Sequence, residues 1–362
     1  MPARSNLPET ARHSEPHPYV NHYTELSRQV KESGLLRRRY GYYWAKMSLT
    51  VLTLAAIGTA FGFLGDSWFQ LIGAGLLAVV FAQLAFLGHD AAHRQIFRSG
   101  RANEWAGLIQ GTLLGGLSYG WWQGKHSRHH ANPNKLGADP DVDPGVIAFT
   151  PHARESRRGI TAWLADRQGY FLFPLMLFEG VNLHVRSVQK LAGRAPVKYR
   201  WWEAAFLCIR LGGYLTALLL VLSPGKAAAF LAVQLGLYGL YMGAAFTPNH
   251  TGMPIVPRPM KIDFLRRQVL TSRNISGGWF IHFALGGLNH QIEHHLFPNM
   301  PRPNLRRVRP LVRDFCHRHD ITYTETSLLA SYGIVIRYLN DVGLAGRDPF
   351  GCPLAAALRA PA

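Results

Sequence analysis

Three short motifs place histidines at the spacing of a helix face and constrain the chain more than any other feature. The motifs are His89-Asp90-Ala91-Ala92-His93, His126-Ser127-Arg128-His129-His130 and Gln291-Ile292-Glu293-His294-His295. Residues three and four apart lie on one side of a helix, so each motif predicts a cluster of side chains that point the same way. Imidazole is a good ligand for iron, zinc, copper and nickel.

One such motif alone is explained equally well by a cluster of surface histidines, by a buried histidine with hydrogen-bond partners, or by a metal site. Three of them in one chain favour a metal site. The eight residues at motif positions exceed what one tetrahedral zinc ion can use. The pattern therefore predicts two metal ions.

Four apolar stretches are long enough to cross a bilayer, at residues 47–64, 68–88, 201–222 and 227–246. They predict an all-α integral membrane protein with four transmembrane helices and a helical cap formed by residues 89–200 and 251–343. Residues 1–45 are expected to form a polar tail followed by an interfacial helix at about residues 23–43. The membrane domain then covers 46–343, and residues 344–362 form a C-terminal tail.

The basic residues outside the apolar stretches indicate how the chain is oriented. They flank the first pair of spans and are absent from the turn at residues 65–67. Because Lys and Arg collect on the cytoplasmic side, both termini and all three motifs are expected there. Residues 102–122 are then interpreted as a re-entrant or interfacial segment, since a further crossing would separate the second motif from the first. Residues 169–190 are expected to form an interfacial helix.

A net charge of +18 combined with 48% hydrophobic residues favours a membrane surface over nucleic acid as the partner, because no nucleic-acid motif accompanies the charge. An acidic electron carrier or an anionic acyl thioester would also suit this charge. The three cysteines are scattered, which argues against a disulfide framework.

Polar residues beside and outside the motifs are also expected to contribute to the site or to its surroundings. His250 ends the last span at the level of the motifs, which makes it a candidate ligand. Asp90 and Glu293 are expected to orient ligand imidazoles through the second ring nitrogen, and His290 is expected beside the ligands rather than among them.

Loop-capping or supporting roles are favoured for the aspartates between 139 and 143. For His184 a polar-face position is favoured over a ligand role, and for His282 both remain open. Arg210, inside a span, should face the bundle interior.

The sequences HDAAH, HSRHH and QIEHH, in this order, resemble the three histidine boxes of the membrane fatty acid desaturases. Gln291 at the first position of the third box resembles the front-end branch, of delta-6 or linoleoyl-CoA type. So do the flanking runs HHANPN, DPD and LFPNMP. The resemblance extends from about Tyr23 to Gly343.

The resemblance implies a di-iron enzyme that uses O2 and two electrons to introduce a double bond into an acyl chain carried by CoA or by a lipid. The implied metal ligands are His89, His93, His126, His129, His130, His250, His294 and His295, with Gln291 as a weaker or water-mediated contact. Many front-end members carry a fused cytochrome b5 domain with a His-Pro-Gly-Gly motif, which this sequence lacks. A separate donor is therefore expected, either a ferredoxin with its reductase or a free cytochrome b5.

Two alternatives use the same residues. A hydroxylase or ketolase could share the scaffold, and only product analysis separates it from a desaturase. A metal transporter is disfavoured because transporters bind near the bilayer midplane, whereas these motifs lie at helix ends on one face.

Overall fold

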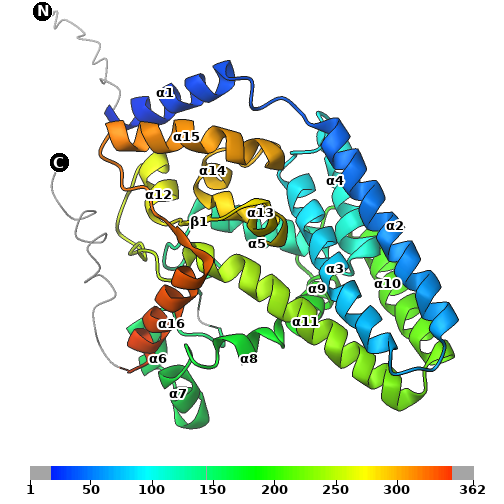
Figure 1. The fold of residues 1–362 in the computed structure, drawn as a ribbon. Coiled ribbons are helices and arrows are strands. Elements are labelled where there is room, and N and C mark those ends of the chain that lie inside the picture. Colours follow the sequence, from blue (N-terminus) through cyan, green and yellow to red (C-terminus); the bar gives the residue numbers. More distant parts are fainter. Residues whose placement is uncertain (1–17, 144, 345–362) are drawn as a thin grey trace, which may run out of the picture.

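The structure is a computed structural model and describes residues 18–143 and 145–344. It confirms the predicted all-α membrane fold (Figure 1). A bundle of long helices carries a cap of shorter helices at one end, and the motifs lie at the junction. The expected tails at residues 1–17 and 345–362 lie outside the described residues.

Among the residues described, four helices are long and apolar enough to cross a membrane. They are α2 (Tyr40–Leu64), α3 (Gln70–Ala92), α10 (Arg200–Val221) and α11 (Pro224–His250). Two of them continue past the predicted spans towards the cap: α3 to Ala92 instead of residue 88, and α11 to His250 instead of residue 246. The ends of these two helices therefore carry His89 and His250 out of the bundle and into the site.

The expected interfacial helix at residues 23–43 differs from the structure. Helix α1 (Pro18–Glu32) ends early, and Tyr40 to Tyr43 form the first turn of α2. The break follows from Gly34, whose φ of +70° lies in the left-handed region that ends a helix. Leu26 and Val30 are fully buried and pack against the cap instead of lying on a lipid surface.

The apolar segment between the first two motifs folds back within the bundle. Helix α4 (Gly100–Gly107) continues as a π-helix, η1 (Leu108–Leu114), which ends beside the middle of α10, where Arg210 Nε donates to the Leu114 carbonyl at 2.9 Å. Gly116, with φ +81°, reverses the chain, and α5 (Tyr119–Ala131) returns towards the cap. The second motif thus reaches the same end of the bundle as the first.

The remaining elements form the cap and its connections to the bundle. They are α6 (Pro151–Glu155), α7 (Gly159–Asp166), α8 (Leu172–Met176), α9 (Glu179–Ala192), α12 (Phe264–Leu270), α13 (Trp279–Ala284), η2 (Leu288–His290), α14 (Gln291–Leu296), α15 (Arg302–Arg318) and α16 (Leu328–Leu344). Strands β1 (Asn274–Ser276) and β2 (Glu325–Ser327) pair in parallel.

Two hydrophobic cores hold this arrangement on either side of the histidines. One lies between the spans and includes Phe81, Phe86, Phe230 and Tyr238. The other lies in the cap, where Val308, Val312 and Phe315 of α15 pack on Ile292 and Leu296 of α14. The third motif is therefore fixed from above by the cap core, while the first is fixed from below by the bundle core.

Candidate metal centre

Five histidines from three helices converge at the end of the bundle. Their ligand atoms all lie within 4.8 Å of one another, and the group consists of His89, His93, His126, His130 and His294. We call it the five-histidine group. Its members come from α3 or the residue after it, from α5 and from α14.

Seven ring nitrogens of the five-histidine group are buried without a hydrogen-bond partner. The Nε2 atom of every member is buried without a hydrogen bond, and so are both ring nitrogens of His130 and His294. Burial lowers the pKa of His93, His126, His130 and His294 well below its usual value, and the neighbouring histidines lower it further. These rings are therefore neutral and offer lone pairs. Buried polar atoms without partners are costly, and a cation among them removes that cost.

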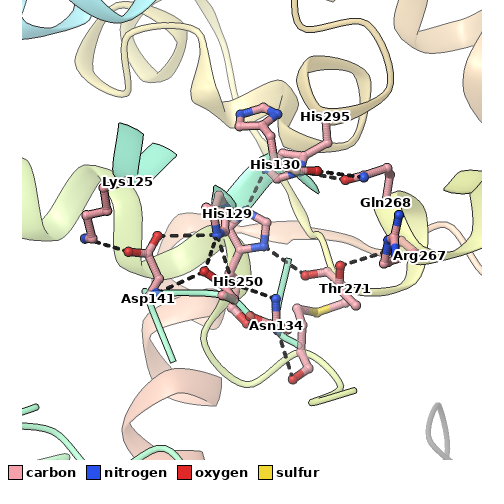
Figure 2. A network of polar contacts seen from close by, with 12 residues as sticks. Lys125, His129, His130, Asn134, Asp141, His250, Arg267, Gln268, Thr271 and His295 are labelled. Carbon is pink, nitrogen blue, oxygen red and sulfur yellow. Dashed lines mark hydrogen bonds and ion pairs between the residues drawn. The ribbon is translucent and has the colours of Figure 1, made fainter. Parts of the chain in front are cut away.

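Three more histidines form a second group: His129 on α5, His250 at the end of α11 and His295 on α14. We call it the three-histidine group (Figure 2). Their Nε2 atoms face one another, with separations of 3.3 Å between His129 and His250 and 3.1 Å between His250 and His295. With metal–nitrogen bonds of roughly 2.0–2.1 Å, neighbouring ligand nitrogens of one ion lie about 3.0–3.4 Å apart. The observed separations fit a shared metal.

Hydrogen bonds at the opposite ring nitrogens fix which lone pairs point inward. His250 Nδ1 donates to the Thr271 carbonyl at 2.9 Å, and His295 Nδ1 donates to Gln268 Oε1 at 2.8 Å. In the neutral rings both Nε2 atoms are then acceptors, and two acceptors at 3.1 Å repel each other. A cation turns this repulsion into ligation.

Gln291 completes the three-histidine group. Its amide nitrogen lies 2.8 Å from His250 Nε2, while its Oε1 is buried without a partner. Rotation of the amide by half a turn would place the oxygen beside the three nitrogens, so Gln291 can act either as a donor to His250 or as an oxygen ligand.

Each of the last two motifs serves both groups. His126 and His130, four residues apart, belong to the five-histidine group, whereas His129 belongs to the three-histidine group. On α14, His294 joins the first group, while Gln291 and His295, also four residues apart, join the second. Adjacent residues on a helix point about 100° apart, so each pair of neighbouring histidines spans two metal positions. The rings of His130 and His295 stack at 4.1 Å where the groups meet.

Two carboxylates contact the Nδ1 atom of His129, on the side of the ring opposite the nitrogen that faces the three-histidine group. His129 Nδ1 lies 2.9 Å from the buried carboxylate of Asp139 and 3.3 Å from Asp141, which in turn pairs with Lys125 at 2.6 Å. Burial alone would lower the pKa of His129, but the hydrogen bond that its Nδ1 donates to Asp139 and the charge of Asp141 outweigh burial and raise the pKa. A carboxylate behind a ligand imidazole fixes its tautomer and increases its basicity.

Asp90 and Arg302 form a fully buried ion pair beside the five-histidine group. Asp90 lies 3.4 Å from His89 Nδ1, and its other oxygen lies 2.7 Å from the Arg302 guanidinium, which also donates to the Phe86 carbonyl. The predicted role of Asp90 beside a ligand histidine fits this contact.

Two glycines let the third motif approach this pair. Gly286 and Gly287 have φ values of +59° and +83°, and a Cβ atom on either would lie 2.3 Å from the Phe86 ring or 2.5 Å from Arg302 Cγ. A side chain at either position would therefore displace α14 from the metal groups.

Glu293 and His290 lie away from the metal groups. Glu293, expected to orient an imidazole, instead accepts hydrogen bonds from Asn274 at 2.8 Å and Tyr323 at 2.7 Å, because it points to the cap side of α14. Burial raises its pKa to about 7. His290 lies beside Asn289 and His282.

Neither His184 nor His282 joins a metal group within the described part of the chain. His184 Nδ1 hydrogen-bonds the Gly180 carbonyl of its own helix. Gln268, Thr271 and Arg302 contact ligands or their partners but had no sequence signal, because each comes from a segment without a motif.

A cavity of about 700 Å³ leads from the surface to the metal groups. Its inner end is lined by His89, His126, His129, His250 and Gln291, and its walls by apolar side chains such as Leu172, Met176, Met242 and Phe246. Its lining is mostly apolar and includes histidines of both metal groups, which suits an alkyl chain that must reach the metals.

The family profile described as fatty acid desaturase matches residues 66–327, a range that contains all three motifs. The chain belongs to this family. It is 27% identical to a delta(8)-fatty-acid desaturase of Borago officinalis over 90% of this chain and 76% of the relative. It is also 28% identical to the delta(6)-fatty-acid desaturase fat-3 of Caenorhabditis elegans, over 89% and 75%. An acyl-lipid (9-3)-desaturase of Borago officinalis is 27% identical over 91% and 78%.

This desaturase is therefore a membrane oxidoreductase that acts on fatty acyl chains. The predictions of family, fold and enzyme class are confirmed, and the relatives favour desaturation over hydroxylation. The two histidine groups are where such an enzyme can hold metal.

Proposed function

We propose that this desaturase holds two iron ions, one in each histidine group, and uses O2 and two electrons to introduce a double bond into an acyl chain. The observation that carries the proposal is the convergence of eight imidazoles, five and three, at an apolar cavity, with four of the eight residues buried and four half-buried. Two irons held in these positions would supply the activation of O2, which is the oxidant: with two electrons and two protons it takes up the two hydrogens of the chain and leaves as water.

The residues of the chain itself position the substrate and the metals. The walls of the cavity hold the alkyl chain and keep water away, so that two adjacent carbons lie next to His89, His126 and Gln291. Asp139, Asp90 and Gln268 hold three ligand imidazoles in fixed orientations. No side chain of the cavity has to act as a nucleophile.

The relatives also support a front-end position for the double bond. The similar proteins are named delta(8)-, delta(6)- and (9-3)-desaturases, and Gln291 stands at the first position of the third motif. We assign the same class of position to this enzyme.

The electrons are proposed to come from an acidic redox carrier at the cytoplasmic face. Helix α15 exposes Arg306, Arg307 and Arg313 there, and positive surfaces accelerate association with acidic partners. The same helix begins at Arg302, which contacts Asp90 and through it His89. The distribution of Lys and Arg supports placing this face in the cytoplasm.

The test is expression in a host with defined fatty acids, followed by mass spectrometry that locates double bonds. The expected result is a new front-end double bond, lost in the His294→Ala variant at equal expression, and close to two irons per purified chain. A product with an added hydroxyl group and no new double bond would support the hydroxylase alternative and contradict the proposal.

A further inference from the structure

The outer end of the cavity opens beside a helix that exposes an apolar stripe. Seven residues that line the cavity are exposed and form its rim: Asp141, Asp143, Gly145, Val146, Phe178, Asn182 and Arg186. Phe178, Asn182 and Arg186 belong to α9 or its first turn, so α9 forms one side of the opening.

The outer surface of α9 is suited to lipid. Val181, Val185 and Val188 are 45%, 44% and 46% exposed, and Phe178 is 70% exposed. The basic residues Lys190 and Arg194 follow at its C-terminal end. A helix with an apolar stripe and basic residues at one end lies in the membrane interface with its stripe among the acyl chains. The rim of the cavity is then at the level of the lipid headgroups.

The charges at the rim distinguish between possible carriers of the acyl chain. The charged residues of the rim are one cation, Arg186, and two carboxylates, Asp141 and Asp143. Lys125 and Glu179 also line the cavity but are half-buried. Lys125 is already paired with Asp141 at 2.6 Å, while Arg186 makes no hydrogen bond or ion pair among the described residues. A coenzyme A thioester brings several phosphate charges, and the rim offers them one unpaired cation beside two carboxylates. A zwitterionic phospholipid brings one phosphate for Arg186 and one ammonium group for the carboxylates.

We propose that the acyl chain enters the cavity sideways from the bilayer, past α9, while still attached to a zwitterionic glycerophospholipid whose phosphate pairs with Arg186. The inference rests on the proposed desaturase function and adds the substrate carrier and its route. Because the headgroup stays at the rim, the depth of the cavity sets how far along the chain the metal groups can reach.

The first test measures the position of α9 without any turnover. A nitroxide spin label is attached at Val185→Cys, with native cysteines replaced, in phosphatidylcholine vesicles, and a second variant carries the label at the exposed Arg337 of α16. The label at 185 should be relaxed by oxygen and shielded from a water-soluble nickel complex, while the label at 337 shows the opposite. Equal exposure of both labels to the nickel complex would overturn the lateral route.

The second test supplies the same acyl chain as phosphatidylcholine in vesicles or as the CoA thioester, with a reducing system. Phospholipid-bound chains should be converted, and Arg186→Glu should raise KM roughly three- to tenfold with little change in kcat, because the phosphate is remote from the reacting carbons. Arg186→Lys should stay near the wild type, and Arg337→Glu serves as a charge-matched control.

The outcomes separate the two proposals. Conversion of the CoA thioester alone, or an Arg186→Glu variant that folds and shows an unchanged KM, overturns the inference and leaves the desaturase function intact. Failure to convert either substrate with iron loaded contradicts the function itself.

Discussion

Gln268 Oε1 accepts a hydrogen bond from His295 Nδ1 at 2.8 Å, and the amide nitrogen of the same side chain donates to the His130 carbonyl at 3.0 Å. This fully buried glutamine thus connects the second and third motifs and sets the tautomer of a ligand imidazole (Figure 2). We expect it to stabilise metal in the three-histidine group.

Gln268→Leu should weaken metal binding at that group by roughly 10–100-fold, because His295 loses its orienting partner. Gln268→Glu keeps an acceptor for His295 and should retain metal better than the leucine variant. Metal content after dialysis against graded chelator concentrations measures the difference, with Gln29→Leu on α1 as the control. Equal retention in the glutamate and leucine variants would show that the hydrogen bond has no orienting role.

The two histidine groups should lose metal separately. His250→Ala removes a member of the three-histidine group and His93→Ala a member of the five-histidine group. Each variant should retain close to one metal ion per chain where the wild type holds two, and both should lose desaturation because the site acts as a unit. Retention of two ions by either variant would contradict the division into five and three.

Neighbouring histidines should be far less sensitive. His290→Ala should lower activity by roughly 10–100-fold at most, since its ring contacts Asn289 and His282 instead of a metal group. His317→Ala, on the exposed side of α15, should be close to neutral. Product formation normalised to expression checks both, and an inactive His290→Ala variant with normal expression would place His290 among the ligands.

The buried ion pair should be a major source of stability. Arg302→Met leaves the Asp90 carboxylate buried without its cation, which should cost roughly 3–5 kcal/mol. Arg28→Met, which breaks the exposed pair with Glu32, should cost about 0–1 kcal/mol. Thermal unfolding of metal-free protein in detergent compares the two, and the double variant with Asp90→Asn should recover part of the loss. Similar melting temperatures for both single variants would argue against the importance of the buried pair.

The proposed orientation can be tested by labelling. Single cysteines at Ser67 and Ser223 should react with an impermeant thiol reagent in intact cells, whereas a cysteine at Ser127 should react only after lysis. The two turns lie at one end of the bundle, and Ser127 lies at the other, on α5. Labelling of the Ser127 variant in intact cells would contradict the cytoplasmic placement of the second motif.

The parts of the fold that depend on local pattern could be predicted from the sequence. Four apolar runs predicted the four long helices, and helical spacing predicted that three motifs would form clusters. The early end of α1 was missed because its apolar positions continue past Gly34, whose backbone angle only the folded chain reveals.

The division of the ligands could not be predicted from spacing. Spacing shows that His129 and His130 are neighbours, but which group each joins depends on where α11 and α14 pack. The roles of Gln268 and Arg302 likewise follow from contacts between segments far apart in the chain. Glu293 was expected to orient a ligand imidazole because it is adjacent to His294, yet helix rotation directs it to Tyr323.

The wide separation of the ligands along the chain also determines when the site can exist. His89 and His93 emerge from the ribosome with the first pair of spans, whereas His294 and His295 belong to a helix made after all four spans. Neither histidine group is complete until α14 has been synthesised and has settled beneath α15. Metal capture must therefore be a late step of biogenesis, and a chain that stalls before α14 would insert into the membrane without ever becoming a metalloprotein.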